Sequence, residues 1–350
     1  MAGARWRWTL AVVVALVAGV AGCGSSDKRT DVKKIAFVAP YRDNELDWTL
    51  QAREVVSEFP KALGVRVDTV DASQTRDVRG ALEQLSHEGD QLVIAHDSRY
   101  ADAAEAAAAD TKVPELVWGE RPHAPKGLVG QITVQDKEGG YMAGVVAAHA
   151  AITRRLAIVV LADGSDWDLA TWNRTAGGFV AGARSVDPRE QIAYTQVGQE
   201  GHATIAQVHD AAARLLASGS QMIFTLGGAS TLGALRAVEQ RSGESQYVGV
   251  VGDKATFNRE NFVLASIIWD TRPVFRQVLA DLRAGRFAER PYSLTLKNRG
   301  IWLLQTGRTP NDAYEAAMAE GRKIEAGTLQ VPVTSTSEAV KALIAGAPQG

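Results

Sequence analysis

The sequence predicts an α/β protein of two lobes, each a parallel sheet flanked by helices, with a cleft between the lobes. Three observations predict this class. From residue 33 onward, short apolar runs alternate with alanine-rich segments of helical periodicity, the cadence of a parallel sheet covered on both faces. The alternation runs through two successive series of similar length. The chain of 350 residues is also longer than most single domains.

The first series begins with 34–39, an apolar run typical of a buried strand. Residues 48–59 have helical periodicity, and 65–70 alternate apolar and polar residues with the period of a half-buried strand. The rest of the series repeats these patterns. Its members are helix 77–87, strand 91–95, helix 101–109, strand 115–118 and strand 127–132.

The second series opens with a helix over 137–152, where small residues repeat along one side. That repeat favours close helix packing or a crossover between lobes. The elements that follow again alternate between strand and helix. They are strand 156–161, helix 169–184, strand 191–195, helix 204–217, strand 221–225, helix 230–240 and strand 247–251.

The C-terminal part is expected to return to the first lobe through a strand over 263–268. A helix over 272–284 follows and ends at Gly285, a natural helix terminator; the segment 294–303 and a helix over 312–320 close the pattern. The expected organisation has five parts. They are a leader over 1–22, a tether over 23–32, lobe 1 over 33–138 completed by about 266–330, lobe 2 over 139–265, and a C-terminal tail over 331–350.

The N-terminus has the pattern of a secretory signal peptide. Arg5 and Arg7 precede an apolar run over 10–21. A dozen helical residues cover roughly 18 Å, well short of the ~30 Å hydrocarbon core of a bilayer. The run is therefore typical of a cleaved leader and not of a spanning helix.

The leader ends in Val20-Ala21-Gly22-Cys23, which resembles the lipobox of bacterial lipoproteins. The resemblance implies cleavage before Cys23, diacylglycerol on its sulfur together with palmitate, and a lipidated, flexible tether. A free cysteine is more often a small buried residue, but this one lies between an apolar leader and a polar segment. We therefore expect a protein anchored at the extracytoplasmic face of the cell membrane.

The composition excludes other classes of partner. The formal net charge is −2 and no basic stripe is present, which argues against nucleic acid. No second apolar stretch is long enough to span a bilayer. Cys23 is the only cysteine, so the folded part has to be stabilised by its hydrophobic core without disulfides.

Polar and aromatic residues follow several of the predicted strands. Doubly wound sheets bind ligands at the carboxyl ends of their strands, and two facing lobes would bring these ends to one cleft. The candidate ligand-binding residues are Tyr41, Asp43, Glu45, Trp48, Thr49, His96, Asp97, Trp172, Phe179, Gly227, Gly228, Asp253 and Trp269. Flat rings beside hydrogen-bonding groups suit a planar polar ligand such as a nucleoside.

Plainer explanations exist for several of these residues. Trp48 is also compatible with the core of a lobe, although we favour the site. Asp97 or Ser98 has the character of a helix N-cap, and Asp253 has a similar capping explanation. The Gly227-Gly228 pair lacks the lysine and hydroxyl residue of a phosphate-binding loop. Two further tryptophans, Trp118 and Trp302, are expected in the core.

The sequence contains no recognisable catalytic motif. It lacks a Gly-x-Ser-x-Gly elbow and a His-Glu-x-x-His pair, and the lipidated Cys23 leaves no cysteine nucleophile. His96 and Asp97 have no partner ligands at metal-binding spacing. We therefore expect a binding protein without a metal or cofactor, and not an enzyme.

The chain resembles the basic membrane protein family, lipoprotein substrate-binding proteins similar to purine nucleoside receptors of ABC transporters. The similarity runs from about Lys34 to about Phe287. Four motifs carry it in order. They are the small-residue helix 139–148, Asn173-Arg174 with 178–182, Gly227-Gly228 with Leu232-Gly233, and Val248-Gly249-Val250 with Asp253. The resemblance implies a type I periplasmic-binding fold, delivery of a nucleoside to a permease, and no catalysis.

The same resemblance implies roles for individual residues. Trp48 stands where the family has a stacking phenylalanine, while Thr49 and Glu45 replace its asparagine and aspartate. Asp253 would hold the ribose hydroxyls. Trp269 replaces a family lysine, which changes the polar half of the pocket and leaves open a different nucleoside, a free base or another small molecule.

These inferences combine into one expected function. The protein is a monomeric, membrane-anchored lipoprotein that closes its lobes around a nucleoside-like solute and delivers it to an ABC permease. A sensor that passes the signal to a partner protein is one alternative. A cell-envelope enzyme that uses His96 and Asp97 is another.

Overall fold

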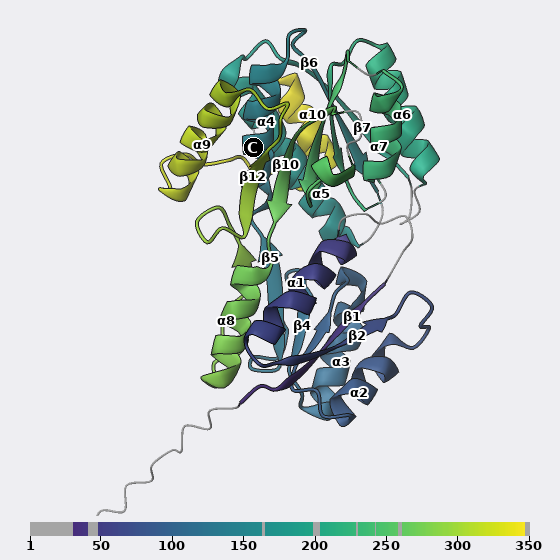
Figure 1. Ribbon diagram of the computed structural model, residues 1–350, viewed down its shortest axis with the longest axis vertical. Coiled ribbons are helices and arrows are strands. Elements are labelled where there is room, and N and C mark those ends of the chain that lie inside the picture. Colours follow the sequence, from purple (N-terminus) through teal and green to yellow (C-terminus); the bar gives the residue numbers. More distant parts are fainter. Residues whose placement is uncertain are drawn as a thin grey trace, which may run out of the picture.

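The computed structural model describes residues 31–40, 48–162, 165–198, 204–228, 230–241, 243–257 and 261–346. They form two lobes, one above the other along the long axis of the molecule (Figure 1). The first lobe holds a six-stranded sheet of order β11-β5-β4-β3-β1-β2, and the second a six-stranded sheet of order β12-β10-β9-β8-β6-β7. The predicted α/β class, with a mainly parallel sheet in each lobe, is confirmed.

The first lobe follows the predicted alternation closely. Its elements are β1 (Lys34–Ala39), α1 (Trp48–Ala62), β2 (Arg66–Asp71), α2 (Val78–His87), β3 (Val93–Ala95), the 3-10 turn η1 (Ser98–Tyr100), α3 (Ala101–Thr111), β4 (Glu115–Trp118) and β5 (Val129–Val134). The apolar strand β1 pairs in parallel with β2 on one edge and β3 on the other, with Ala36 opposite Asp68 and Val93. Alternate residues of β1 face two separate apolar cores, with Ile35 and Phe37 in one and Ala36 and Val38 in the other. Both faces of the strand are therefore covered, and five of its six residues are buried.

The second lobe repeats this arrangement. Its elements are α4 (Asp136–Ala150), β6 (Arg155–Leu161), α5 (Asp166–Val186), β7 (Gln191–Val197), α6 (Ile205–Ala217), β8 (Met222–Leu226), α7 (Ser230–Glu239), β9 (Gln246–Val251), η2 (Ala255–Phe257) and β10 (Val263–Trp269). Helices α5 and α6 both start with a capping box. The pairs are Ser165 with Asp168 and Thr204 with Gln207, so local sequence fixes where these helices begin.

Three described segments cross between the lobes. Strand β5 leads into α4, β10 leads into α8 (Arg272–Arg283), and β11 (Tyr292–Leu294) leads into β12 (Ile301–Gln305). Backbone hydrogen bonds connect the crossing segments. Gln135 N donates to Leu294 O (2.9 Å), and Asp270 N donates to Gly300 O (2.8 Å). The crossings therefore form one compact hinge region between the sheets.

The C-terminal third differs from the expected organisation. We expected about 266–330 to complete lobe 1, but β10 and β12 lie in the second sheet and only α8 and β11 belong to the first lobe. The reason is that β12 returns antiparallel beside β10, a pairing that strand order along the chain does not reveal. The described residues after β12 form two helices that pack on the second lobe, and the second of them occupies part of the range 331–350 where we expected a tail. They are α9 (Asn311–Glu325), packed on α4, and α10 (Ser337–Ala345), packed on α5.

The small residues of α4 serve close helix packing, and the helix also begins directly after a crossover. A Cβ atom on Gly140 would lie 2.1 Å from Thr175 O, and one on Gly144 would lie 2.1 Å from Phe179 O. Helix α5 contributes Gly178 and Gly182 to the same contact. A Cβ atom added to these residues would lie 2.2 and 2.0 Å, respectively, from carbonyl oxygens of α4. The two helices therefore meet backbone to backbone. No helix in the described ranges has the length and apolarity to cross a bilayer.

Candidate functional site

Six ring-bearing residues gather where the two lobes meet, and we call them the aromatic cluster. They are Trp48, His96, Trp118, Trp167, Trp172 and Trp269. Five of them come from segments at the carboxyl ends of strands or from the helix start that follows, and one of the five is Trp167, the second residue of α5. His96 directly follows β3, Trp118 and Trp269 end β4 and β10, and Trp48 begins α1. The cluster thus occupies the place where doubly wound sheets bind ligands.

The rings are in contact within each lobe and across the interface. In the first lobe the centroids of Trp48 and Trp118 lie 4.4 Å apart. In the second, Trp172 and Trp269 stack at 5.5 Å with an angle of 12° between their planes. Trp48 meets the edge of Trp269 at 5.8 Å, and Trp118 lies 6.3 Å from Trp167. These two contacts join the lobes through aromatic surface.

His96 is buried, with 1% of its surface exposed, and both of its ring nitrogens are bonded to the protein. The indole N–H of Trp118 donates to His96 Nδ1 at 2.9 Å. An indole nitrogen only donates, so Nδ1 carries no proton, and Nε2–H donates to the carbonyl oxygen of Trp48 at 3.2 Å. Burial lowers the pKa of His96 to about 4, against smaller opposing effects of the Trp48 carbonyl and Asp97. His96 was predicted as a ligand-binding residue, and in this structure the protein itself uses both of its ring nitrogens.

The depressed pKa of His96 predicts a pH dependence of stability. Between its folded value of about 4 and its ordinary value of 6.5, the unfolded chain binds a proton that the folded protein does not. The free energy of unfolding therefore rises with pH across this window, by about 1.4 kcal/mol per pH unit from this group. In urea denaturation between about pH 4.5 and about pH 7.5, His96→Gln should show a shallower rise than the wild type. Equal slopes would contradict a neutral, buried His96.

Polar groups of η1 also reach the second lobe. Asp97 is the N-cap of η1 and accepts hydrogen bonds from Arg99 N (2.9 Å) and Arg99 Nε (2.8 Å). Its capping explanation is therefore the one that the structure supports. Ser98 Oγ donates to Asp168 Oδ2 at 2.5 Å and lies 2.9 Å from Ser165 Oγ. Burial raises the pKa of Asp168, while the hydrogen bonds from Ser98 and Ser165 oppose that effect.

Thr49 and Gly227 each take part in a hydrogen bond to the backbone that directly follows a strand, β1 and β8 respectively. Thr49 is buried, and its Oγ1 donates to Pro40 O at 3.2 Å, which ties the start of α1 to the end of β1. Gly227 has a φ of +110° directly after β8, a conformation that side chains disfavour. Its carbonyl oxygen accepts a hydrogen bond from Ser230 Oγ at 2.5 Å. Gly228, the next residue, is partly exposed.

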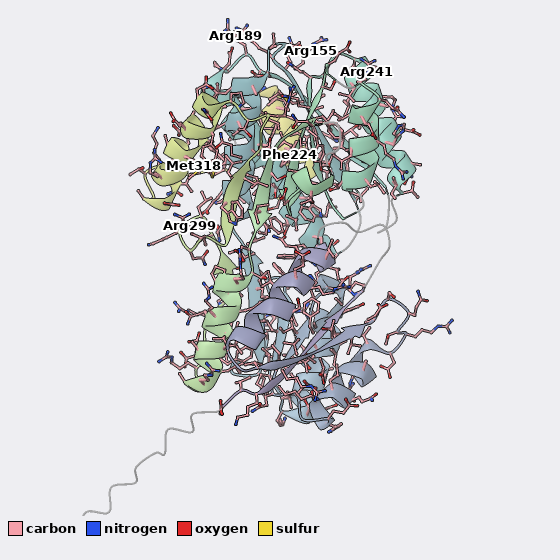
Figure 2. The ribbon with its side chains drawn as sticks, viewed as in Figure 1. Arg155, Arg189, Phe224, Arg241, Arg299 and Met318 are labelled. Atoms are coloured by element: carbon pink, nitrogen blue, oxygen red, sulfur yellow. The ribbon has the colours of Figure 1, made fainter. Side chains whose placement is uncertain are left out.

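Two predicted ligand residues lie apart from the cluster. Phe179 is fully buried and stacks on Phe224 at 4.7 Å in the interior of the second lobe, where Figure 2 labels Phe224. The exposed Asp253 accepts a hydrogen bond from Ala255 N at 2.8 Å in the turn that leads into η2. The neighbouring Lys254 is the buried member of that pair. These positions give Phe179 a packing role and place Asp253 in a turn in this conformation.

Some predicted residues lie outside the described ranges, and some cluster members were missed. Tyr41, Asp43, Glu45 and the predicted lipidation site Cys23 fall outside the described ranges. Trp118 was expected only in the core, and Trp167 was not selected. Their position was a usable signal, because Trp118 ends a strand and Trp167 lies just after the cap of α5. Trp302, also expected in the core, is half-buried in β12.

The cluster also offers hydrogen-bond donors. The indole N–H groups of Trp167 and Trp269 are buried and have no hydrogen-bond partner among the described residues. A buried donor without an acceptor costs about 1–3 kcal/mol, so an acceptor placed there would be favoured. In the described ranges no group of three or more His, Cys, Asp or Glu residues has the arrangement of a metal site.

Comparison with known proteins identifies related chains. The model of a family described as ABC transporter substrate-binding protein PnrA-like (Bmp) matches residues 32–325. The ABC transporter nucleoside-binding protein BmpA of Lactococcus lactis subsp. cremoris is 24% identical over 348 residues, which cover 92% of this chain and 97% of that protein. The transcriptional activator protein med of Bacillus subtilis is 21% identical over 184 residues, 52% of this chain and 55% of that protein.

Solved structures share the fold. A solute-binding protein of an ABC transporter system from Conexibacter woesei superimposes with a TM-score of 0.71 at 24% identity, over 86% of this chain and 99% of that one. A periplasmic solute-binding protein from Actinobacillus succinogenes with bound D-allose matches with a TM-score of 0.59 at 16% identity, over 79% and 98%. The predicted two-lobed, type I periplasmic-binding fold is confirmed.

Proposed function

Because the chain belongs to the family of PnrA-like ABC transporter substrate-binding proteins, we propose that it is a lipid-anchored lipoprotein that binds a nucleoside between its lobes and delivers it to a permease. It acts as a monomer, without catalysis. Membership of this family means that the protein is a solute-binding component of an ABC transporter. The nucleoside as ligand, the lipid anchor at Cys23 and the delivery to a permease each have a separate experimental test.

The aromatic cluster is the observation that carries the nucleoside proposal. Flat indole faces match the face of a nucleobase, since ring stacking adds about 0.5–1.5 kcal/mol beyond the area it buries. The indole N–H groups of Trp167 and Trp269, which have no partner among the described residues, match the acceptor nitrogens and oxygens of a base or ribose. The relative BmpA is named as a nucleoside-binding protein, which supports the same ligand class.

The interface also supports closure of the lobes around the ligand. Ser98 of the first lobe bonds to Asp168 of the second, and the ring pair Trp48 and Trp269 spans the same interface. Both contacts exist only while the lobes are together. Rotation about the three crossing segments would break them and expose the cluster, as in hinge-type binding proteins.

Tryptophan fluorescence gives a direct test, because five of the six tryptophans after residue 30 belong to the cluster. We expect adenosine, guanosine or inosine to change the emission of the mature protein and to raise its Tm, whereas D-glucose should do neither. A ligand at 100 times its Kd stabilises the folded state by about 2.7 kcal/mol. Trp172→Ala should abolish the response, and Trp302→Phe, outside the cluster, should retain it. No response to any nucleoside or base would overturn the nucleoside proposal.

The anchor is tested separately through Cys23. We expect the wild type to fractionate with membranes and the Cys23→Ala variant to appear in the soluble extracytoplasmic fraction, because lipidation requires the thiol. Nucleoside binding should be the same in both, since every residue of the aromatic cluster comes from residue 48 onward. A Cys23→Ala variant that stays with the membrane would contradict lipid anchoring at this residue.

Ligand sensing is a second candidate function, favoured by the similarity of half of the chain to a transcriptional activator. Both functions would use the same cluster. Deletion of the protein should stop uptake of the bound nucleoside if it serves a permease. Unchanged uptake with altered gene expression would support sensing instead, and recovery of chemically altered nucleoside would indicate an enzyme.

A further inference from the structure

We propose that His96 is a positioning residue that fixes Trp48 and Trp118 as one rigid wall of the ligand site. The inference rests on the proposed function of the aromatic cluster. It assigns His96 to holding the binding surface and not to contacting the ligand, and it names the face of the site that each lobe contributes.

The hydrogen bonds of the imidazole hold two different segments. The bond from Trp118 Nε1 to His96 Nδ1 (2.9 Å) restricts rotation of the Trp118 ring at the end of β4. The bond from His96 Nε2 to the Trp48 carbonyl oxygen (3.2 Å) holds the first residue of α1. One side chain, fixed at the end of β3, therefore sets the positions of two neighbouring segments that are distant in sequence.

Ring contacts complete the restraint. The His96 ring stacks on Trp48 with centroids 5.3 Å apart and meets Trp118 nearly edge-on at 5.8 Å. Phe37 of β1 packs against the same imidazole at 4.9 Å. Trp48 and Trp118 in turn contact each other at 4.4 Å. The imidazole is thus enclosed by rings, which leaves it neither space nor free nitrogen for a ligand.

The hydrogen bond to His96 also determines which surface of Trp118 is available at the interface. Because His96 takes up the indole N–H of Trp118, that ring presents only carbon surface to the interface. The buried indole donors that lack a partner in the described ranges, those of Trp167 and Trp269, belong to the second lobe. A bound nucleoside would therefore meet the carbon surface of Trp118 on the first lobe and these two donors on the second.

Two substitutions separate positioning from simple packing. In His96→Gln, the amide oxygen can accept from Trp118 and the amide N–H can donate to Trp48; in His96→Leu, neither bond can form. We expect the Kd for the best purine nucleoside to rise about tenfold or more in H96L and to stay within about threefold of the wild type in H96Q. Trp118→Phe, which keeps a ring but deletes the donor, should resemble H96L.

Nuclear magnetic resonance supplies a readout that does not depend on a ligand. The indole proton of Trp118, assigned by its absence in W118F, should lie downfield in the wild type and in H96Q, and should move upfield in H96L. The ¹⁵N shifts of the His96 ring should show protonated Nε2 and unprotonated Nδ1, and should not change when nucleoside is added.

The possible results distinguish the proposed nucleoside-binding function from the positioning role of His96. If the wild type binds nucleosides and H96L binds them equally well, His96 is not a positioning residue although the proposed function stands. If addition of nucleoside shifts the His96 nitrogens, His96 contacts the ligand and the inference is wrong. If no nucleoside binds, the proposed function fails, while the Trp118 resonance still reports whether His96 holds that ring. If H96L does not fold, the Kd values of H96Q and W118F test the positioning role instead: a Kd of W118F within threefold of the wild type would contradict it.

Discussion

Replacement of Gly144 by alanine is expected to lower the free energy of unfolding by about 3 kcal/mol or more. The new Cβ would lie 2.1 Å from Phe179 O and 2.7 Å from Ala183 N. Both atoms belong to the backbone of α5, which cannot rotate away as a side chain can. Helices α4 and α5 would have to separate along their whole contact, and the loss of packing outweighs the gain of about 1 kcal/mol in helix propensity.

Urea denaturation of the full chain measures this effect. Gly307→Ala is the matched control, because a Cβ there meets no atom within 4 Å and the residue is not in the left-handed region. We expect it to stay within about 0.5 kcal/mol of the wild type. A Gly144→Ala variant as stable as Gly307→Ala would show that α4 and α5 do not pack backbone to backbone.

Replacement of Glu115 by glutamine is expected to stabilise the protein at neutral pH. Glu115 begins β4, has 0% of its surface exposed, and neither carboxylate oxygen has a hydrogen-bond partner among the described residues. Burial raises the pKa of Glu115 well above its ordinary value. The folded protein therefore keeps this proton at pH values where the unfolded chain has released it, and the free energy of unfolding falls as pH rises.

The size of the effect follows from the same linkage. Above about pH 4.3, the wild type should lose about 1.4 kcal/mol per pH unit relative to Glu115→Gln, until the raised pKa is reached. Urea denaturation at about pH 5 and about pH 7.5 should show a larger advantage of the variant at the higher pH. Glu239→Gln, on the exposed end of α7, is the control and should show no such increase. An advantage that is equal at both pH values would mean that Glu115 is ionised in the folded state.

Most of the fold could be predicted from local pattern. The apolar run at β1 and the alternation at β2 predicted strands at nearly their observed bounds. Gly285 was expected to end its helix, and it follows α8 with a φ of +68°. These signals succeed because hydrophobic periodicity and backbone conformation depend on neighbouring residues. The antiparallel return of β12 beside β10 has no such local signature.

The candidate site could be predicted in part. The rule that ligands bind at the carboxyl ends of strands selected Trp48, His96, Trp172 and Trp269, and the structure brings these four together. The same rule applied to every strand end would also have selected Trp118. Asp253 was chosen from a motif, but its place beside η2 turns it to solvent and leaves Lys254 inside.

The sequence by itself determined the family, the alternation of strands and helices, and the chemical character of the site as aromatic. Only the tertiary structure decided how those rings are used. His96 lies 22 residues from Trp118 and 48 from Trp48 along the chain, so its proton-bearing nitrogen is set by partners that only folding brings near. The same holds for the aromatic cluster as a whole, because ring contacts and buried hydrogen bonds depend on distances in space, whereas strand and helix patterns depend on neighbours in sequence.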